Sequence, residues 1–318
     1  MDENFPPENP QFNKQFLSAG AQNNLKLPPV LKVILIAFSL FIAGQIVSTL
    51  LTLGIGYIFK INSDVLLKQN VDPFSLQHRS YLRLALFLSH IFSFILPAIF
   101  TLQYFYKKEW LEAIGLNRFP SWKLVGLSIL FLLASIPLVS FSSEINKMIP
   151  LPPMLKSMES STNLILKTIL KKDFFYEIVL NVILIGIIPA IGEELMFRGV
   201  LQQQIGRLVR NQHAMVWITA CIFSAIHFQF EGFLPRAILG AVLGYLFVWT
   251  KSIWLPMMAH LFNNAAQVIA IYVLNIKPED ADKIGTDTRI HWTFALSSIF
   301  FMFVLARIIQ NENFKELS

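Results

Sequence analysis

Long apolar runs separated by short polar connections make up most of the chain from residue 29 onwards. A helix needs about 20 mainly apolar residues to cross the hydrocarbon of a bilayer. That length predicts about eight membrane segments, some of them short or interrupted, near residues 29–59, 81–106, 123–142, 174–206, 213–230, 235–250, 253–275 and 291–309. The pattern therefore predicts an all-α fold, a polytopic transmembrane helix bundle.

The polar stretches suggest one membrane domain with a tail at each end. Residues 1–28 are rich in Asn, Gln and Pro and lack an apolar core. They predict a disordered polar tail rather than a cleaved secretory signal, so the first apolar segment would act as an uncleaved signal anchor. The membrane domain is expected over residues 29–310, with a short tail at 311–318. The longer loops at 107–122 and 143–173 could hold extra structure, the first as an interfacial helix.

Small residues and proline mark two places where helices depart from simple packing. Gly240 and Gly244 lie four residues apart in the short sixth segment, which predicts close approach of a neighbouring helix. Pro189 and Gly192 predict a kink in the fourth segment, directly before two glutamates.

Composition supports an integral, multi-pass membrane protein. The chain is 54% hydrophobic and 14% charged, whereas soluble domains carry roughly a quarter charged residues. Membrane lipid is therefore an expected partner. The net charge is +6, but the basic residues are scattered, so no nucleic-acid partner is expected. Cys221 stands alone and can form no intramolecular disulfide or Cys-rich metal site.

A few ionisable residues interrupt the apolar segments, at a cost of about 2.5–3.5 kcal/mol each on insertion scales. Such residues usually face the protein interior and serve function. Glu194 and Arg198 are four residues apart with the acid first, which predicts an ion pair. Glu193 points about 100° away from Glu194 and needs a partner from another helix.

Two histidines are candidates for the partner of Glu193. His260 and Asn264 share one helix face, and His227 follows Phe223 by one turn. A carboxylate, two imidazoles and an amide are groups that can hold and deprotonate a water. His90 stands apart in the second segment and is interpreted as a hydrogen-bonded structural residue.

Three ordered motifs give the sequence a family resemblance. Over roughly residues 174–275, Glu193, Glu194 and Arg198 match EExxxR, Phe223 and His227 match FxxxH, and His260 and Asn264 match HxxxN. In these the chain resembles the CPBP family (CAAX protease and bacteriocin-processing), which includes the eukaryotic prenyl-protein endopeptidase.

The resemblance implies a helix bundle that hydrolyses a peptide bond within or near the membrane. It implies that Glu193 is the general base and that His227 places the water. His260 and Asn264 would stabilise the oxyanion, with Glu194 and Arg198 as supporting residues. A membrane-associated or lipidated peptide or protein is the implied substrate, and a bacterial inner membrane the expected location.

Several alternatives remain open at this point. Family members have been described both as metalloproteases and as glutamate-dependent proteases. No cofactor is therefore certain, and a divalent metal such as zinc is an alternative at Glu193, His227 and His260. A non-catalytic scaffold or bacteriocin self-immunity protein could keep the same motifs, and a proton-coupled transporter also uses buried acids and histidines.

One geometric condition decides whether the histidines share a site. His227 lies about 14 residues into the fifth segment and His260 about 7 into the seventh, which separates upright helices by about 10 Å in depth. A joint site therefore requires tilted or shortened segments.

Overall fold

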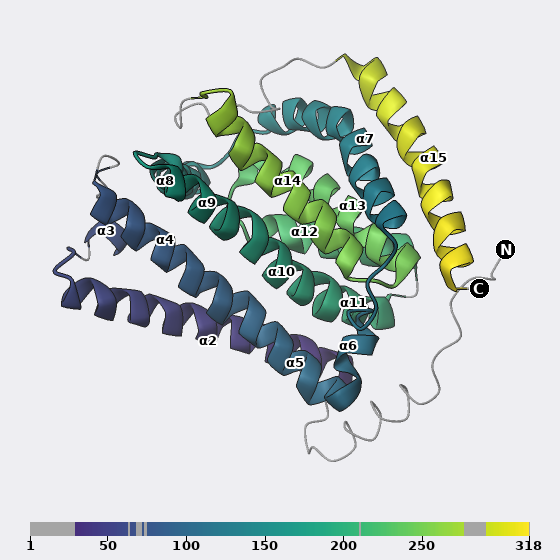
Figure 1. Ribbon diagram of the computed structural model, residues 1–318, viewed down its shortest axis with the longest axis horizontal. Helices are drawn as coiled ribbons and strands as arrows, with labels where there is room; N and C mark the ends of the chain where they lie inside the picture. The colour runs from purple at the N-terminus through teal and green to yellow at the C-terminus, as the bar shows by residue number, and fades with distance from the viewer. Residues whose placement is uncertain are drawn as a thin grey trace.

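The computed structural model describes residues 29–62, 64–67, 72, 75–209, 211–276 and 291–317. The predicted tail at 1–28 lies outside these residues. Within them the chain is helical and contains no strand, which confirms the all-α prediction (Figure 1). The helices are α2 (Pro29–Ile58), α3 (Asp64–Leu67), α4 (Leu76–His90), α5 (Leu96–Tyr106), α6 (Trp110–Ala113), α7 (Trp122–Lys147), α8 (Pro153–Leu170), α9 (Phe175–Asn181), α10 (Ile188–Glu194), α11 (Gln203–Leu208), α12 (Gln212–Ala225), α13 (Phe233–Thr250), α14 (Trp254–Val273) and α15 (Trp292–Leu317).

Short π-helical and 3-10 segments join several of these helices into longer ones. The π-helical segments are η1 (Ile91–Ile95), η3 (Val182–Ile187) and η4 (Leu195–Gln202), and the 3-10 segments are η2 (Lys107–Glu109) and η5 (Phe230–Gly232). Two of the predicted loops contain helix: α6 forms in the first and α8 in the second. The last helix continues to Leu317, past residue 310 where the membrane domain was expected to end.

Six helical stretches of the described chain are long and apolar enough to cross a membrane. They are Val30–Ile58, Leu76–Ala113, Trp122–Lys147, Phe175–Leu208, Phe230–Thr250 and Trp292–Glu316. The predicted segments at 213–230 and 253–275 are also helical, as α12 and α14. However, α12 has only 14 residues, and α14 carries His260 and Asn264 among its apolar residues. The chain is an integral membrane protein, and the predicted number of about eight segments was approximate: six stretches of the described residues are long and apolar enough to span a membrane.

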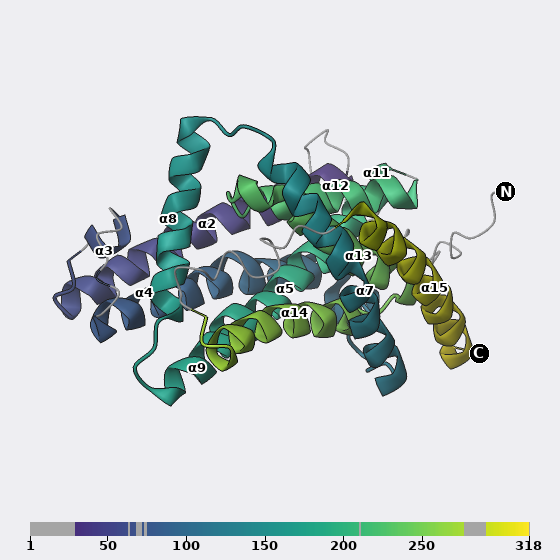
Figure 2. The ribbon, with the colours of Figure 1, turned by 90° about the horizontal axis from the view of Figure 1, so that it is seen from above.

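The helix Phe175–Leu208 runs through the middle of the bundle and positions the polar residues (Figure 1). On one side, α4, η1 and α5 pack against it, with α2 behind them. On the other side lie α13 and α14, followed by α7 and then α15. Figure 2 shows α8 crossing the direction of α2, α4 and α14 at one end. Apolar side chains from η1, α5, η4, α12 and α14 meet in one buried cluster that includes Phe94, Leu102, Phe197, Phe223 and Met257.

Glycines allow two close helix contacts. A Cβ on Gly240 would lie 3.1 Å from the Phe223 ring and 3.3 Å from the Cα of Ala220, so α13 packs tightly on α12 there. This confirms the predicted close approach. A Cβ on Gly44 would lie 1.9 Å from the carbonyl oxygen of Phe92, which brings the backbone of α2 against η1.

Pro189 and Gly192, where a kink was predicted, both lie in α10, and the irregular turns are two π-helical segments on either side of it. The seven residues of α10 end in Glu193 and Glu194. A π-helical turn holds an extra residue and so rotates the side chains that follow it; such turns are frequent at functional sites. The directions of the two glutamates therefore depend on η3.

Candidate active site

Glu193 and Glu194 are both buried at the end of α10, with exposed fractions of 6% and 0%. Because consecutive helical residues point about 100° apart, the two carboxylates face different neighbours. Each carboxylate is the centre of its own polar cluster.

The Glu194 cluster joins three helices. Oε1 of Glu194 accepts hydrogen bonds from Nη1 of Arg198 at 2.9 Å and from Nδ1 of His260 at 2.8 Å. Nη2 of Arg198 donates to the carbonyl oxygen of Gly240 on α13 at 2.9 Å, and the guanidinium lies over the Phe223 ring. The ion pair predicted from spacing is present, and it also fixes the ring of His260.

The Glu193 carboxylate faces three histidines from three other parts of the chain. Nε2 of His90, on α4, lies 3.5 Å from Oε1 of Glu193. Nε2 of His227 and Nε2 of His260 each lie 3.9 Å from Oε2. The predicted depth difference is closed, because α12 ends at Ala225 and His227 lies in the turn that follows. The geometric condition for a joint site is therefore met.

The contact between His90 and Glu193 was not predicted from the sequence, and the interpretation of His90 as a hydrogen-bonded structural residue stays a prediction. His90 lies in an apolar segment with no motif partner nearby in sequence. Its contact with Glu193 bridges residues about a hundred positions apart and depends on how α4 packs against α10. The cost of an ionisable group in an apolar segment was the available signal.

Hydrogen bonds at the Nδ1 atoms determine what the three rings present to Glu193. Nδ1 of His90 lies 3.1 Å from the carbonyl oxygen of Leu86, and Nδ1 of His227 lies 2.7 Å from that of Phe223. Since a carbonyl or carboxylate oxygen only accepts, Nδ1 carries the proton in each neutral ring, including that of His260. The three Nε2 lone pairs therefore converge on a carboxylate, and a donor such as water is required between them.

Comparison with known proteins agrees with the motif positions. Residues 175–266 match the family model described as "Type II CAAX prenyl endopeptidase Rce1-like". This segment is Rce1-like. The match confirms the family resemblance and includes Glu193, Glu194, Arg198, His227 and His260, together with Asn264.

Two proteins of Bacillus subtilis (strain 168) are similar over part of their length. "Uncharacterized protein YpbD" is 29% identical over 117 residues, which is 36% of this chain and 57% of that protein. "Putative membrane peptidase YdiL" is 30% identical over 148 residues, which is 46% of this chain and 57% of that protein. The chain thus spans little more than half the length of these relatives. No solved structure gives a significant match.

Within the Rce1-like segment, Asn264 is not hydrogen-bonded to the other candidate residues in the described part of the chain. Its Nδ2 donates to the carbonyl oxygen of Ile185 in η3 at 3.1 Å, and its Oδ1 accepts from Nδ2 of Asn263 at 3.0 Å. The amide thus ties α14 to the π-helical segment before α10. It lies one turn beyond His260, as the spacing predicted.

The donor atoms around Glu193 resemble a metal site in two respects, the first being that three Nε2 atoms face one carboxylate. The second is that histidines that bind metals usually donate their other ring N–H to an oxygen acceptor, as all three do here. In the part of the chain that the structure describes, however, no three His, Cys, Asp or Glu side chains are spaced to hold a metal ion. The set as it stands fits a water, which can donate to a carboxylate and to an imidazole at once.

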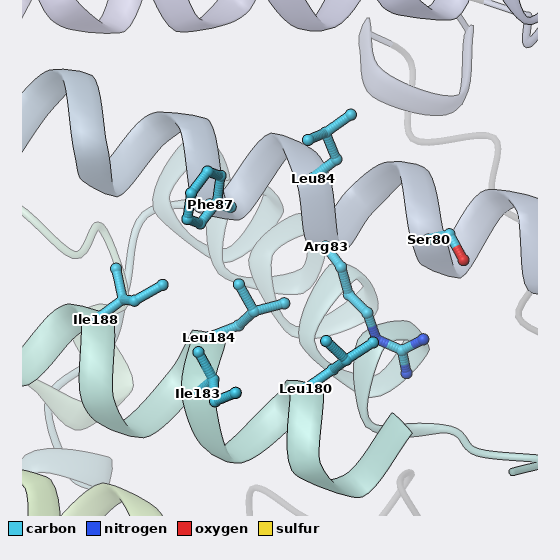
Figure 3. Close-up of a pocket in the computed structure, with 8 residues that line it drawn as sticks. All are labelled: Ser80, Arg83, Leu84, Phe87, Leu180, Ile183, Leu184 and Ile188. Atoms are coloured by element: carbon cyan, nitrogen blue, oxygen red, sulfur yellow. The ribbon is translucent and has the colours of Figure 1, made fainter. Parts of the chain in front are cut away.

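An apolar cavity of about 320 Å³ lies between α4 and the α9–η3–α10 helix (Figure 3). Its lining residues are Ser80, Arg83, Leu84, Phe87, Leu180, Ile183, Leu184 and Ile188. The guanidinium of Arg83 donates hydrogen bonds to Glu177 and Asn181. Phe87 lies one turn before His90 on α4, and Ile188 begins α10, so the cavity follows the same helix pair as the Glu193–His90 contact.

Proposed function

We propose that this chain is an intramembrane endopeptidase in which Glu193 activates the water that hydrolyses a peptide bond. The observation that carries the proposal is the buried Glu193 carboxylate, faced by the Nε2 atoms of His90, His227 and His260. The Rce1-like segment and the membrane-peptidase name given to one relative support the same reading.

The first step is attack on the scissile carbonyl. A water between Oε2 of Glu193 and Nε2 of His227 gives a proton to the carboxylate, and its oxygen bonds to the carbonyl carbon. His227 accepts the water's second hydrogen bond and fixes the direction of attack. The peptide C=O becomes a tetrahedral oxyanion.

The second step needs donors for the oxyanion and a proton for the leaving group. Nε2 of His260 can donate to the oxyanion when it carries a proton, while Nδ1 keeps its hydrogen bond to Glu194. One N–H of Asn264 is used by Ile185, and the other is left for the oxyanion. The C–N bond breaks as Glu193 passes its proton to the amine.

The surroundings of the site favour a membrane-associated or lipidated peptide or protein as substrate. The cavity of Figure 3 is apolar and lies between two helices that can span a membrane. An apolar chain attached to a peptide could enter there from the bilayer and bring the peptide towards Glu193. We also propose a bacterial inner (cell) membrane as the location, since two similar proteins come from a bacterium.

The test is Glu193→Gln, which keeps the size of the side chain and removes the base. We expect cleavage to fall by about 10²–10⁴-fold, the usual contribution of a general base. Peptides that accumulate in cells carrying the variant would identify the substrate by mass spectrometry. Exposed Glu109, changed to Gln, is the matched control and should leave cleavage unchanged.

Full activity of a stably expressed Glu193→Gln variant would overturn the proposal. A retained biological effect would then favour a non-catalytic scaffold or self-immunity protein. Proton or solute flux in reconstituted vesicles, blocked by changes at both His90 and His227, would favour a transporter.

A further inference from the structure

Arg236 is a half-buried cation at the edge of the candidate active site. It lies in the first turn of α13, and its guanidinium interacts electrostatically with Glu193, Glu159 and His227. Its hydrogen-bond acceptor, Gln229, comes two residues after His227. None of the three family motifs includes it.

The direct partners of Arg236 are neutral. Nη1 donates to the backbone carbonyl of Gln229 and Nη2 to its Oε1, both at 3.0 Å. By contrast, Arg79, Arg83 and Arg198 each have a carboxylate oxygen between 2.6 and 3.1 Å away. No described carboxylate lies within 4.0 Å of Arg236.

Packing holds the Arg236 guanidinium in place before any ligand binds. The guanidinium occupies space that Gly232 leaves open, because a Cβ at residue 232 would lie 3.0 Å from Nη2 of Arg236. Asn146 on α7 clamps the preceding loop by donating to the carbonyl oxygens of Phe230 and Glu231 and accepting from the N–H of Leu234. Such pre-organisation lowers the entropy cost of binding.

A partly desolvated guanidinium whose N–H groups are not all hydrogen-bonded favours the binding of an anion. Two of the five N–H groups of Arg236 have acceptors among the described residues, which leaves three. A carboxylate matches this planar fork and gives short, charge-assisted bonds. The positive end of the α13 helix dipole adds to the attraction. Arg236 would also offset the repulsion that Glu193 exerts on an approaching anion.

We propose that Arg236 forms a subsite for a carboxylate group of the peptide substrate, beside the scissile bond. This inference rests on the proposed function. The carboxylate could be the free C-terminus of the peptide or an Asp or Glu side chain near the cleaved bond. Both present the same planar anion, so the experiment must separate them.

The probe is a short S-prenylated peptide in which a ketomethylene group replaces the scissile amide, so that binding is measured without turnover. Three forms are compared: a free C-terminal carboxylate, a C-terminal amide, and an amide with aspartate as last residue. We expect the wild type to bind one or both carboxylate forms about 10-fold more tightly than the neutral amide, as hydrogen bonds to charged groups suggest.

Arg236→Gln should remove this preference while leaving affinity for the neutral amide unchanged. Arg236→Lys keeps the charge but loses the fork, and should retain only part of the preference. Equal binding of all three forms by the wild type would overturn the proposal, whether or not the variants fold. So would an undiminished preference in folded Arg236→Gln.

Failure of this inference can be told apart from failure of the proposed function. If Glu193→Gln cleaves normally while wild-type binding depends on Arg236 and the carboxylate, the subsite stands and the catalytic role of Glu193 falls. If Glu193→Gln is inactive and the three peptides bind alike, Glu193 keeps its role and the carboxylate subsite falls.

Discussion

At the scale of single residues, the first question is what His90 adds to the Glu193 carboxylate. It comes from outside the Rce1-like segment, yet its Nε2 lies closer to Glu193 than those of His227 and His260. Nδ1 of His90 uses its proton in the hydrogen bond to the carbonyl oxygen of Leu86. A direct hydrogen bond between Nε2 of His90 and Glu193 therefore requires one further proton, on the ring or on the carboxylate. We interpret His90 as a positioning residue for the base.

We expect His90→Ala to lower kcat by about 10–100-fold, the cost of one hydrogen bond to a charged group. The pH profile of kcat should also shift, because the base loses its nearest ring. Kinetics of the purified protein over a range of pH would show both effects. His213→Ala, which removes an exposed histidine bonded to Tyr245, serves as control. An unshifted profile would make His90 a packing residue only.

The Glu194 carboxylate orients two side chains of the candidate site, those of Arg198 and His260. A single oxygen receives both Arg198 and His260, so the orientation of the His260 ring is tied to η4 and, through Arg198, to α13. A fully buried carboxylate is costly unless it is paired and hydrogen-bonded. The two donors meet that requirement at Oε1, whereas the buried Oε2 has no hydrogen-bond partner among the described residues. The supporting role proposed for Glu194 and Arg198 rests on the contacts at Oε1.

At the scale of elements, α8 links the loop beside the site to the rest of the bundle. Oε2 of Glu159 on α8 accepts the backbone N–H of Glu231 at 3.0 Å, and Asn163 bonds to Gln229. Burial raises the pKa of Glu159 above its ordinary value of 4.5, although the hydrogen bond from Glu231 and the charge of Arg236 act in the opposite direction. The ionised carboxylate therefore carries a cost in the folded state.

This shift fixes the sign of a pH effect on stability. When the folded-state pKa is raised, the stabilisation is fully present below the unfolded pKa and is lost as pH rises through the folded value. Thermal unfolding of the wild type should therefore show stability declining above pH 4.5. Glu159→Gln should flatten that part of the profile and raise the melting temperature at neutral pH. The control Glu112→Gln, at an exposed position, should change neither the pH profile of stability nor the melting temperature. If Glu159→Gln still loses stability above pH 4.5, another group causes the loss.

Sequence patterns predicted the elements better than their ends. Apolar length predicted helices in all eight regions, because burying backbone polar groups in lipid requires them. It could not predict that α12 stops at Ala225, nor the π-helical turns around α10, since apolar residues tolerate either register. Those two features set the positions of His227 and of the two glutamates.

At the scale of the whole molecule, the site is a convergence of four separate parts of the chain. The motifs predicted that Glu193, His227 and His260 belong together, and their side chains do meet. They did not predict His90 or the contact of Asn264 with η3, because both depend on packing between distant helices. Arg236 belongs to none of the motifs, so its position beside the site could be recognised only in the structure.

Metal dependence is a property of this assembled site. The distances of 3.5–3.9 Å between the Glu193 oxygens and the three Nε2 atoms can be bridged by a water. We therefore expect peptide cleavage to survive treatment with a chelator followed by gel filtration. Activity and bound metal should be measured on the same sample. Loss of activity that zinc restores in equal stoichiometry would place a metal at Glu193, His227 and His260.

The order in which the four parts occur along the chain has a consequence during biosynthesis. His90 and Glu193 are made first, His227 follows, and His260 arrives with α14. While the ribosome is still elongating the earlier helices, Glu193 has no His260 beside it and Glu194 has no second donor. A nascent chain therefore lacks the His260 contacts of both glutamates until α14 has been made.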